Sequence, residues 1–141
     1  MENFILDKDI RVFYITAKSF PDGIADAFHE LHSLLPASQE RILFGISRPE
    51  NGVIVYRAAA EETTPGEAAR LNLETLIIRK GQYISIVIND YRQDIQNIGK
   101  AFKILLAKPG IDPEGYCVEW YGEPGRTGND KDVRCMVRLN D

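Results

Sequence analysis

The sequence lacks the features that mark several large classes of protein. It has 17 Lys and Arg against 21 Asp and Glu, a net charge of −4, so no basic surface for nucleic acid is expected. Its longest apolar runs are far shorter than the roughly 20 residues that cross a membrane. The acidic first ten residues show no secretory leader, and the two cysteines form no spaced framework. These absences predict a cytoplasmic protein.

The motifs of common catalytic and metal sites are also missing. The two histidines lie in HELH, residues 29–32, closer together than the zinc-protease motif requires and without a third ligand. No Ser-His-Asp or Cys-His arrangement can be built from two histidines on one exposed helix. The segment 122–130, GEPGRTGND, lacks the Gly-Lys-Ser/Thr ending that holds nucleotide phosphates, and we expect a hairpin loop there. No metal, cofactor or catalytic residue is therefore predicted.

The remaining composition is that of an ordinary globular protein. Hydrophobic residues make up 44% of the chain and charged residues 27%. A chain of 141 residues can bury one core and is too short for two domains. We expect a single domain over residues 1–141, with a first repeat at about 4–60, a polar connector at about 61–72 and a second repeat at about 73–141.

The division into repeats comes from internal similarity. Residues 4–35 align with residues 75–106 without a gap, and apolar positions agree along the whole window. Ile15 falls on Ile86, for example, and Phe20 falls on Tyr91. Such agreement indicates that one structural unit occurs twice in the chain.

Each repeat predicts the same order of elements. A strand rich in β-branched and aromatic residues is followed by a helix with an apolar stripe, and two further strands close the unit. The expected strands are 11–17, 41–47, 52–59, 82–88, 115–121 and 132–139, with short leading strands at 4–7 and 74–79, and the expected helices are about 22–35 and 91–107, N-capped by Asp22 and Asp90. The fold class is α+β: two pseudo-symmetric β-α-β-β repeats form antiparallel sheets, with two main helices and a groove between the halves.

Alternation along the strands assigns side chains to faces of the sheet. A uniformly apolar face is expected to lie under the helices and consists of Phe13, Ile15, Ile84, Ile86 and Ile88. Superposing the two closing hairpins on Pro49 and Pro124 brings Phe44 onto Glu119. This superposition places Val118 and Trp120 under a helix and Cys117, Glu119 and Tyr121 on the other face. Because Cys135 is then expected to face the helix, the two cysteines lie on opposite faces and remain free thiols.

Glu119 is the most unusual residue of the sequence. It lies within the apolar run GYCVEWYGEP, residues 115–124, where an ionised carboxylate is costly unless something pairs with it. It either faces a ligand or pairs across the hairpin with Arg134 or Arg138. Aromatic residues are expected on the same face, where they suit a flat cation or are ordinary half-exposed sheet residues: Tyr14, Phe44, Tyr56, Tyr83 and Tyr121. Trp120 is either core or a stacking platform.

The chain resembles the GyrI-like small-molecule-binding domain, the effector-binding domain of AraC- and MerR-type multidrug regulators. The resemblance covers nearly the whole chain: the doubled β-α-β-β plan, KGQYISIVI at 80–88, GYCVEWYGEP at 115–124 and KDVRCMVRL at 131–139. Its most specific part is an acid followed two residues later by tyrosine, here Glu119 and Tyr121. In that family the acid lies between the halves and meets cationic, aromatic ligands.

The sequence departs from the family in two respects. It contains no helix-turn-helix region, which implies a stand-alone form, and it has Arg134 where many relatives carry a second acid. The resemblance implies a non-enzymatic binder of small amphipathic or cationic molecules, acting in drug or effector sensing or in sequestration. It also leaves two alternatives: a hydrolase of strained, toxin-like molecules, or an inhibitor that binds a protein such as DNA gyrase.

Overall fold

The computed structural model describes residues 1–36, 41–121 and 131–141. These residues form eight strands, two eleven-residue helices, a short helix and one 3₁₀ turn. The strands are β1 (Glu2–Leu6), β2 (Ile10–Thr16), β3 (Leu43–Glu50), β4 (Val53–Glu61), β5 (Glu74–Ile78), β6 (Gly81–Ile88), β7 (Cys117–Tyr121) and β8 (Val133–Arg138). The helices are α1 (Ile24–Leu34), α2 (Glu67–Leu71) and α3 (Gln96–Leu106), and η1 (Tyr91–Gln93) is the 3₁₀ turn.

All eight strands belong to one antiparallel sheet, in the order β1-β6-β8-β7-β3-β4-β2-β5. The order is symmetric about its centre: each strand of the first repeat takes the place, counted from one edge, that the equivalent strand of the second repeat takes from the other edge. This symmetry confirms the predicted doubled β-α-β-β plan. The two leading strands are swapped: β1 of the first repeat pairs with β6, and β5 of the second repeat pairs with β2. Strands β3 and β7 meet at the centre, where the two repeats join.

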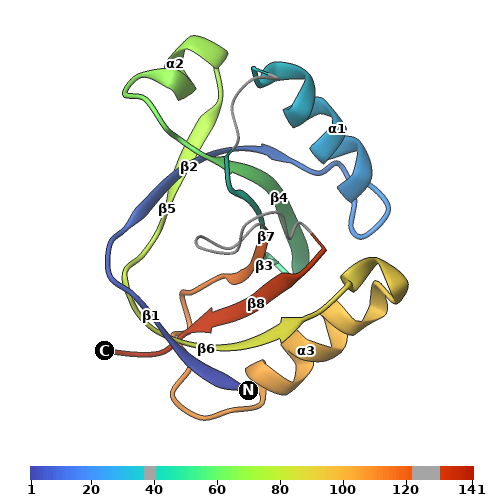
Figure 1. Cartoon of the computed structure of the whole chain (residues 1–141), viewed down its shortest axis with the longest axis vertical. Coiled ribbons are helices and arrows are strands. Elements are labelled where there is room, and N and C mark those ends of the chain that lie inside the picture. Colours follow the sequence, from blue (N-terminus) through green and yellow to red (C-terminus); the bar gives the residue numbers. More distant parts are fainter. Residues whose placement is uncertain (37–40, 122–130) are drawn as a thin grey trace.

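The sheet curls into a half-barrel, and α1 and α3 both lie outside the curve, over different parts of the sheet (Figure 1). Three apolar clusters result. One fills the inside of the curl and includes Phe44, Ile46, Val118, Trp120 and Met136. The other two lie beneath the helices: α1 covers the cluster around Phe13 and Leu31, and α3 covers the cluster around Ile84, Phe102 and Leu105. None of the helices in the described part of the chain has the length and apolar character needed to span a bilayer.

The faces predicted for the first strand of each repeat are confirmed. Phe13 and Ile15 pack in the cluster under α1, and the isoleucines Ile84, Ile86 and Ile88 pack in the cluster under α3. This face is apolar in both repeats because it is the side of the sheet that the helices cover.

The faces predicted for the closing hairpins are partly wrong. Glu119 pairs with Gly45, and Phe44 pairs with Trp120. Phe44, Val118 and Trp120 therefore lie inside the curl, whereas Cys117 and Tyr121 pack in the cluster under α3, on the helix side with Glu119. Placing Phe44 on Glu119 shifted the superposition by one residue, and a shift of one residue turns every side chain to the other face. Pro124 lies outside the described residues.

The starts of both helices also differ from the prediction. The N-cap residues are Gly23 and Ile95 instead of Asp22 and Asp90. Asp90 has a left-handed backbone with φ of 51° and precedes the turn η1, so α3 begins at Gln96. The connector between the repeats contains α2, which the sequence analysis did not predict. A buried ion pair holds α2 in place, with Arg41 Nη2 2.9 Å from Glu67 Oε2.

Candidate ligand-binding site

Glu119 lies where the two repeats join. Helix α1 packs on β2 and β4, and α3 packs on β6 and β8, so the central strands β3 and β7 run between the two helices. Glu119 is the middle residue of β7 and faces the helix side, opposite Gly45 of β3. Its position therefore places one carboxyl group between the two halves of the molecule.

Two phenols hold the Glu119 carboxylate. Tyr56 of β4 donates from Oη to Oε1 at 2.9 Å, and Tyr121 of β7 donates to the same oxygen at 2.5 Å. Glu119 is only 7% exposed. Within the described residues, its second oxygen, Oε2, accepts no hydrogen bond. The carboxylate is thus removed from bulk water, and its partners among the described residues are neutral donors.

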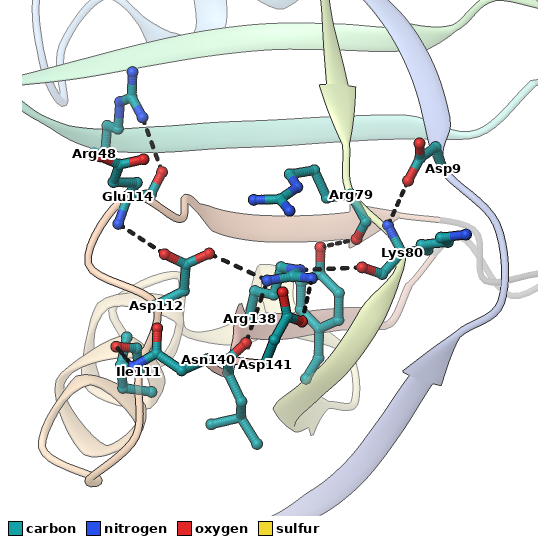
Figure 2. A network of polar contacts seen from close by, with 12 residues as sticks. Asp9, Arg48, Arg79, Lys80, Ile111, Asp112, Glu114, Arg138, Asn140 and Asp141 are labelled. Atoms are coloured by element: carbon teal, nitrogen blue, oxygen red, sulfur yellow. Dashed lines mark hydrogen bonds and ion pairs between the residues drawn. The ribbon is translucent and has the colours of Figure 1, made fainter.

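The alternative in which Glu119 pairs with an arginine of β8 is wrong. Arg134 pairs with Trp120 in the sheet, so its side chain lies inside the curl, where it bonds to Glu2 and Ser85. Arg138 lies on the same inner side and contacts Asp112, Asp141 and the carbonyl of Lys80 (Figure 2). Both guanidinium groups are separated from Glu119 by the sheet itself.

Gly45 makes the Tyr56–Glu119 contact possible. A Cβ atom at position 45 would lie 2.0 Å from Tyr56 Oη and 2.7 Å from Glu119 Oε1. Both distances are too short for any side chain, so the strand opposite Glu119 requires glycine. The sequence analysis did not identify this residue, and a glycine inside a strand pattern is the signal that points to a close approach of other groups.

Aromatic rings surround the tyrosine–glutamate group. Phe28 of α1 contacts both Tyr56 and Tyr121 edge-on, with ring centroids 6.2 Å apart in each case. Phe20 stacks on Tyr56 at 6.0 Å, and Tyr91 contacts Tyr121 at 5.2 Å. The junction site is defined here as Glu119 and these five rings: Phe20, Phe28, Tyr56, Tyr91 and Tyr121. The sequence alignment had matched Phe20 to Tyr91 without assigning either to a site.

Burial dominates the electrostatics of the junction site. It raises the pKa of Glu119 above its ordinary value, and the hydrogen bonds from Tyr121 and Tyr56 offset part of that rise. Burial, and then the charge of Glu119, raise the pKa values of Tyr56 and Tyr121, so both phenols stay protonated as donors. The site therefore combines an acceptor that is costly to ionise with aromatic faces that carry negative partial charge.

The other four predicted site residues lie on the inner side of the sheet. Tyr14 donates a hydrogen bond to Glu74, and Tyr83 donates to the carbonyl of Arg79. Phe44 and Trp120 contact each other in the inner core, with centroids 5.2 Å apart. The structure thus brings together Glu119, Tyr121 and Tyr56 and places Tyr14, Tyr83, Phe44 and Trp120 on the opposite side of the sheet.

The two cysteines are free thiols, as predicted. The prediction that they lie on opposite faces of the sheet is wrong. Cys135 pairs with Glu119 and Cys117 pairs with Val137, so both thiols face the helix side. Burial raises the pKa of Cys117 to about 11 and also raises that of Cys135. Both are therefore poor nucleophiles. The described residues contain no group of three or more His, Cys, Asp or Glu side chains that could hold a metal ion.

Comparisons with known proteins show the fold. No family model matches the chain, and no curated protein matches it by sequence. SAV2435, solved bound to tetraphenylphosphonium, matches with a TM-score of 0.64 at 12% identity, over 99% of this chain and 94% of its own. An integron cassette protein from Vibrio cholerae gives 0.65 at 11% identity, over 99% and 95%. A hydrolase from Listeria innocua gives 0.60 at 8% identity, over 99% and 90%. Proteins with this fold thus include one that binds a small organic cation.

Proposed function

We propose that this protein binds small organic cations with aromatic groups, and that Glu119 supplies the negative charge that recognises them. One observation carries the proposal. Glu119 is a buried carboxyl group whose described partners are two phenols, and aromatic rings from both halves of the molecule surround it.

The physical basis is the low dielectric around the carboxylate. An ionised acid removed from water attracts a cation more strongly than a surface acid does. Aromatic faces add a further attraction of about 0.5–2 kcal/mol for a cation within about 6 Å of a ring centroid. An arriving cation would supply the countercharge that the phenols do not. It would meet Oε2, which accepts no hydrogen bond from the part of the chain that the structure describes.

Two further observations support this assignment. The acid and tyrosine two residues apart in β7 resemble the most specific motif of the GyrI-like domain, and both residues belong to the junction site. The fold is shared with SAV2435, which was solved with an organic cation bound. On this basis we assign the chain to the GyrI-like group as a binder used in effector sensing or sequestration.

Isothermal titration with tetraphenylphosphonium tests the proposal. Wild type is expected to bind it, and Glu119→Gln, which keeps the shape but removes the charge, to bind about ten- to a hundredfold more weakly. Glu30→Gln is the matched control, because Glu30 is an exposed acid on α1. Failure of wild type to bind this cation or other aromatic cations, or equal binding by the Glu119 variant, would refute the proposal.

A hydrolase is the second candidate, because a buried acid with a raised pKa is suited to general acid–base chemistry. The fold is also shared with a hydrolase from Listeria innocua. Product analysis distinguishes the two functions. A binder returns the ligand unchanged after prolonged incubation, whereas a hydrolase consumes an electrophilic small molecule at a rate that Glu119→Gln abolishes.

A further inference from the structure

A small cavity lies on the inner side of the sheet, away from the junction site. Val118 lines this inner cavity and is the neighbour of Glu119 along β7, so the two side chains point to opposite faces. The volume of the inner cavity is about 40 Å³, roughly three times what one water molecule needs. Apolar and aromatic side chains form much of its wall: Ile77, Ile78, Tyr83, Tyr116 and Val118. Its size suits a short hydrocarbon chain better than an aromatic ring.

Two arginines border the inner cavity. Arg79 follows β5 and Arg138 ends β8, and both also line a larger, open depression of about 490 Å³. Figure 2 shows the Arg79 side chain extending toward the segment that carries Glu114. The two guanidinium groups therefore lie between the inner cavity and a space that is open to solvent.

The two arginines differ in their partners. Arg138 is 7% exposed and forms ion pairs with Asp112 and Asp141, at 3.3 and 2.9 Å. Gly81 leaves room for it, because a Cβ atom there would lie 2.8 Å from Arg138 Nη2. Arg79 is exposed, and its guanidinium makes no ion pair or hydrogen bond with residues 1–36, 41–121 or 131–141. Arg79 can therefore take a partner from solution, whereas Arg138 belongs to the framework of the cavity.

The backbone around Arg79 is held in place. The Tyr83 hydroxyl donates to the Arg79 carbonyl at 2.5 Å, and the amide of Lys80 donates to the Asp9 carboxylate at 2.7 Å. Burial raises the pKa of Tyr83 to about 12, so the phenol keeps the proton that it donates. The Arg79 side chain thus starts from a fixed point at the edge of the inner cavity.

We propose that the inner cavity is a second binding site, which takes a small monocarboxylate: the short hydrocarbon chain enters the cavity and Arg79 binds the carboxylate. A guanidinium donates two parallel hydrogen bonds to a carboxylate. The apolar wall favours a hydrocarbon chain over a polar group. Asp112 and Glu114 also line the cavity, and their charges disfavour a doubly charged phosphate. The sheet separates this site from Glu119, so the proposal does not rest on the proposed function.

A titration with butyrate, followed by the amide chemical shifts of ¹⁵N-labelled protein, tests the proposal. Wild type is expected to show saturable shifts in residues 78–83 and 112–118, and Arg79→Gln to bind about tenfold or more weakly. Arg79→Lys keeps the charge but not the paired donors, so it is expected to lose less affinity than Arg79→Gln. Arg70→Gln is the matched control, an exposed arginine on α2, and is expected to bind within about twofold of wild type.

Two further ligands test which chemistry the site recognises. Butyramide has the shape of butyrate without its charge, and phosphate has charge without a hydrocarbon chain. Wild type is expected to bind each at least about tenfold more weakly than butyrate. The proposal is overturned if butyrate causes no saturable shifts, if Arg79→Gln binds it as wild type does, or if phosphate binds more tightly. Shifts centred on Gly45 and Glu119 would also overturn it, because they would place butyrate at the junction site.

Discussion

At the scale of single residues, the junction site depends on how Glu119 is kept in an apolar strand. Burying a carboxylate is costly, and Tyr56 and Tyr121 offset that cost only in part, since the pKa of Glu119 remains raised. Gly45 contributes by having no side chain, which leaves the space that the Tyr56 hydroxyl occupies. Ionised Glu119 therefore makes the fold less stable. The cause is its burial, which is also what would strengthen its attraction for a cation.

The raised pKa predicts how stability changes with pH. The folded protein holds the Glu119 proton more tightly than the unfolded chain does, so this stabilisation is complete below the ordinary pKa of 4.5 and is lost as the pH rises through the folded pKa. Glu119→Gln has no such proton. We expect its free energy of unfolding, relative to wild type, to be constant at acid pH and then to rise by about 1.4 kcal/mol per pH unit between the two pKa values.

Urea denaturation at a series of pH values measures this difference, with Glu30→Gln as the exposed control. The opposite trend, in which the Gln variant loses stability relative to wild type as the pH rises, is what an ion pair of Glu119 would produce and is incompatible with the structure described above.

Gly45→Ala provides a second prediction at this scale. Its Cβ atom would lie 2.0 Å from Tyr56 Oη, so the tyrosine must move and the hydrogen bond to Glu119 is lost. We expect a loss of about 1–3 kcal/mol in the free energy of unfolding, measured in urea. Gly99→Ala is the matched control and is expected to stabilise by about 0.5–1 kcal/mol. An unchanged free energy of unfolding for Gly45→Ala would contradict this prediction and show that the Tyr56 side chain can adopt another conformation without cost.

At the scale of elements, the first strand of each repeat joins the two halves. Strand β1 pairs with β6 of the second repeat, and its Phe4 packs edge-on against Trp120 at 5.7 Å. The guanidinium of Arg134 lies over the Phe4 ring, 4.5 Å from its centroid. Swapping the leading strands thus links the repeats both by strand pairing and by side-chain contacts.

Phe4→Ala tests the contribution of β1. The half-buried ring is expected to contribute about 2 kcal/mol to the free energy of unfolding, less than a fully buried phenylalanine. The neighbouring Ile5 is 64% exposed and points to the other face, so Ile5→Ala is expected to change stability by less than about 0.5 kcal/mol. Equal effects of the two substitutions, measured by urea denaturation, would mean that β1 adds pairing but no packing.

The elements also show where sequence reasoning succeeds and where it fails. Strands β2 and β6 were assigned to the correct face because one face of each is uniformly apolar. Strand β7 was assigned to the wrong faces because both of its faces are covered: Val118, Glu119 and Trp120 are all buried. Cys135 of β8 was placed correctly on the helix side. When both faces are buried, alternation no longer distinguishes them. Only the register with β3 resolves the ambiguity, and that register depends on long-range pairing.

At the scale of the whole molecule, a doubled fold creates a junction that each repeat contributes to differently. The strand order is symmetric, yet Glu119 on β7 faces Gly45 on β3, and Tyr56 on β4 has Val133 as its counterpart on β8. The repeat itself was predictable, because the apolar positions of two helices and two strands agree. The site was predictable only in its acid and two tyrosines. The rings of Phe20, Phe28 and Tyr91 come from segments far apart in the chain, and no local pattern assigns them to Glu119.

The central claim is that the charge of Glu119 recognises the charge of a ligand, and it is tested most directly by changing both charges together. Wild type and Glu119→Gln are titrated calorimetrically with tetraphenylphosphonium and with triphenylphosphine oxide, a neutral molecule with similar rings. We predict that the substitution weakens binding of the cation by about ten- to a hundredfold and binding of the neutral molecule by less than about threefold. An equal loss for both ligands, or no loss for the cation, would contradict the claim.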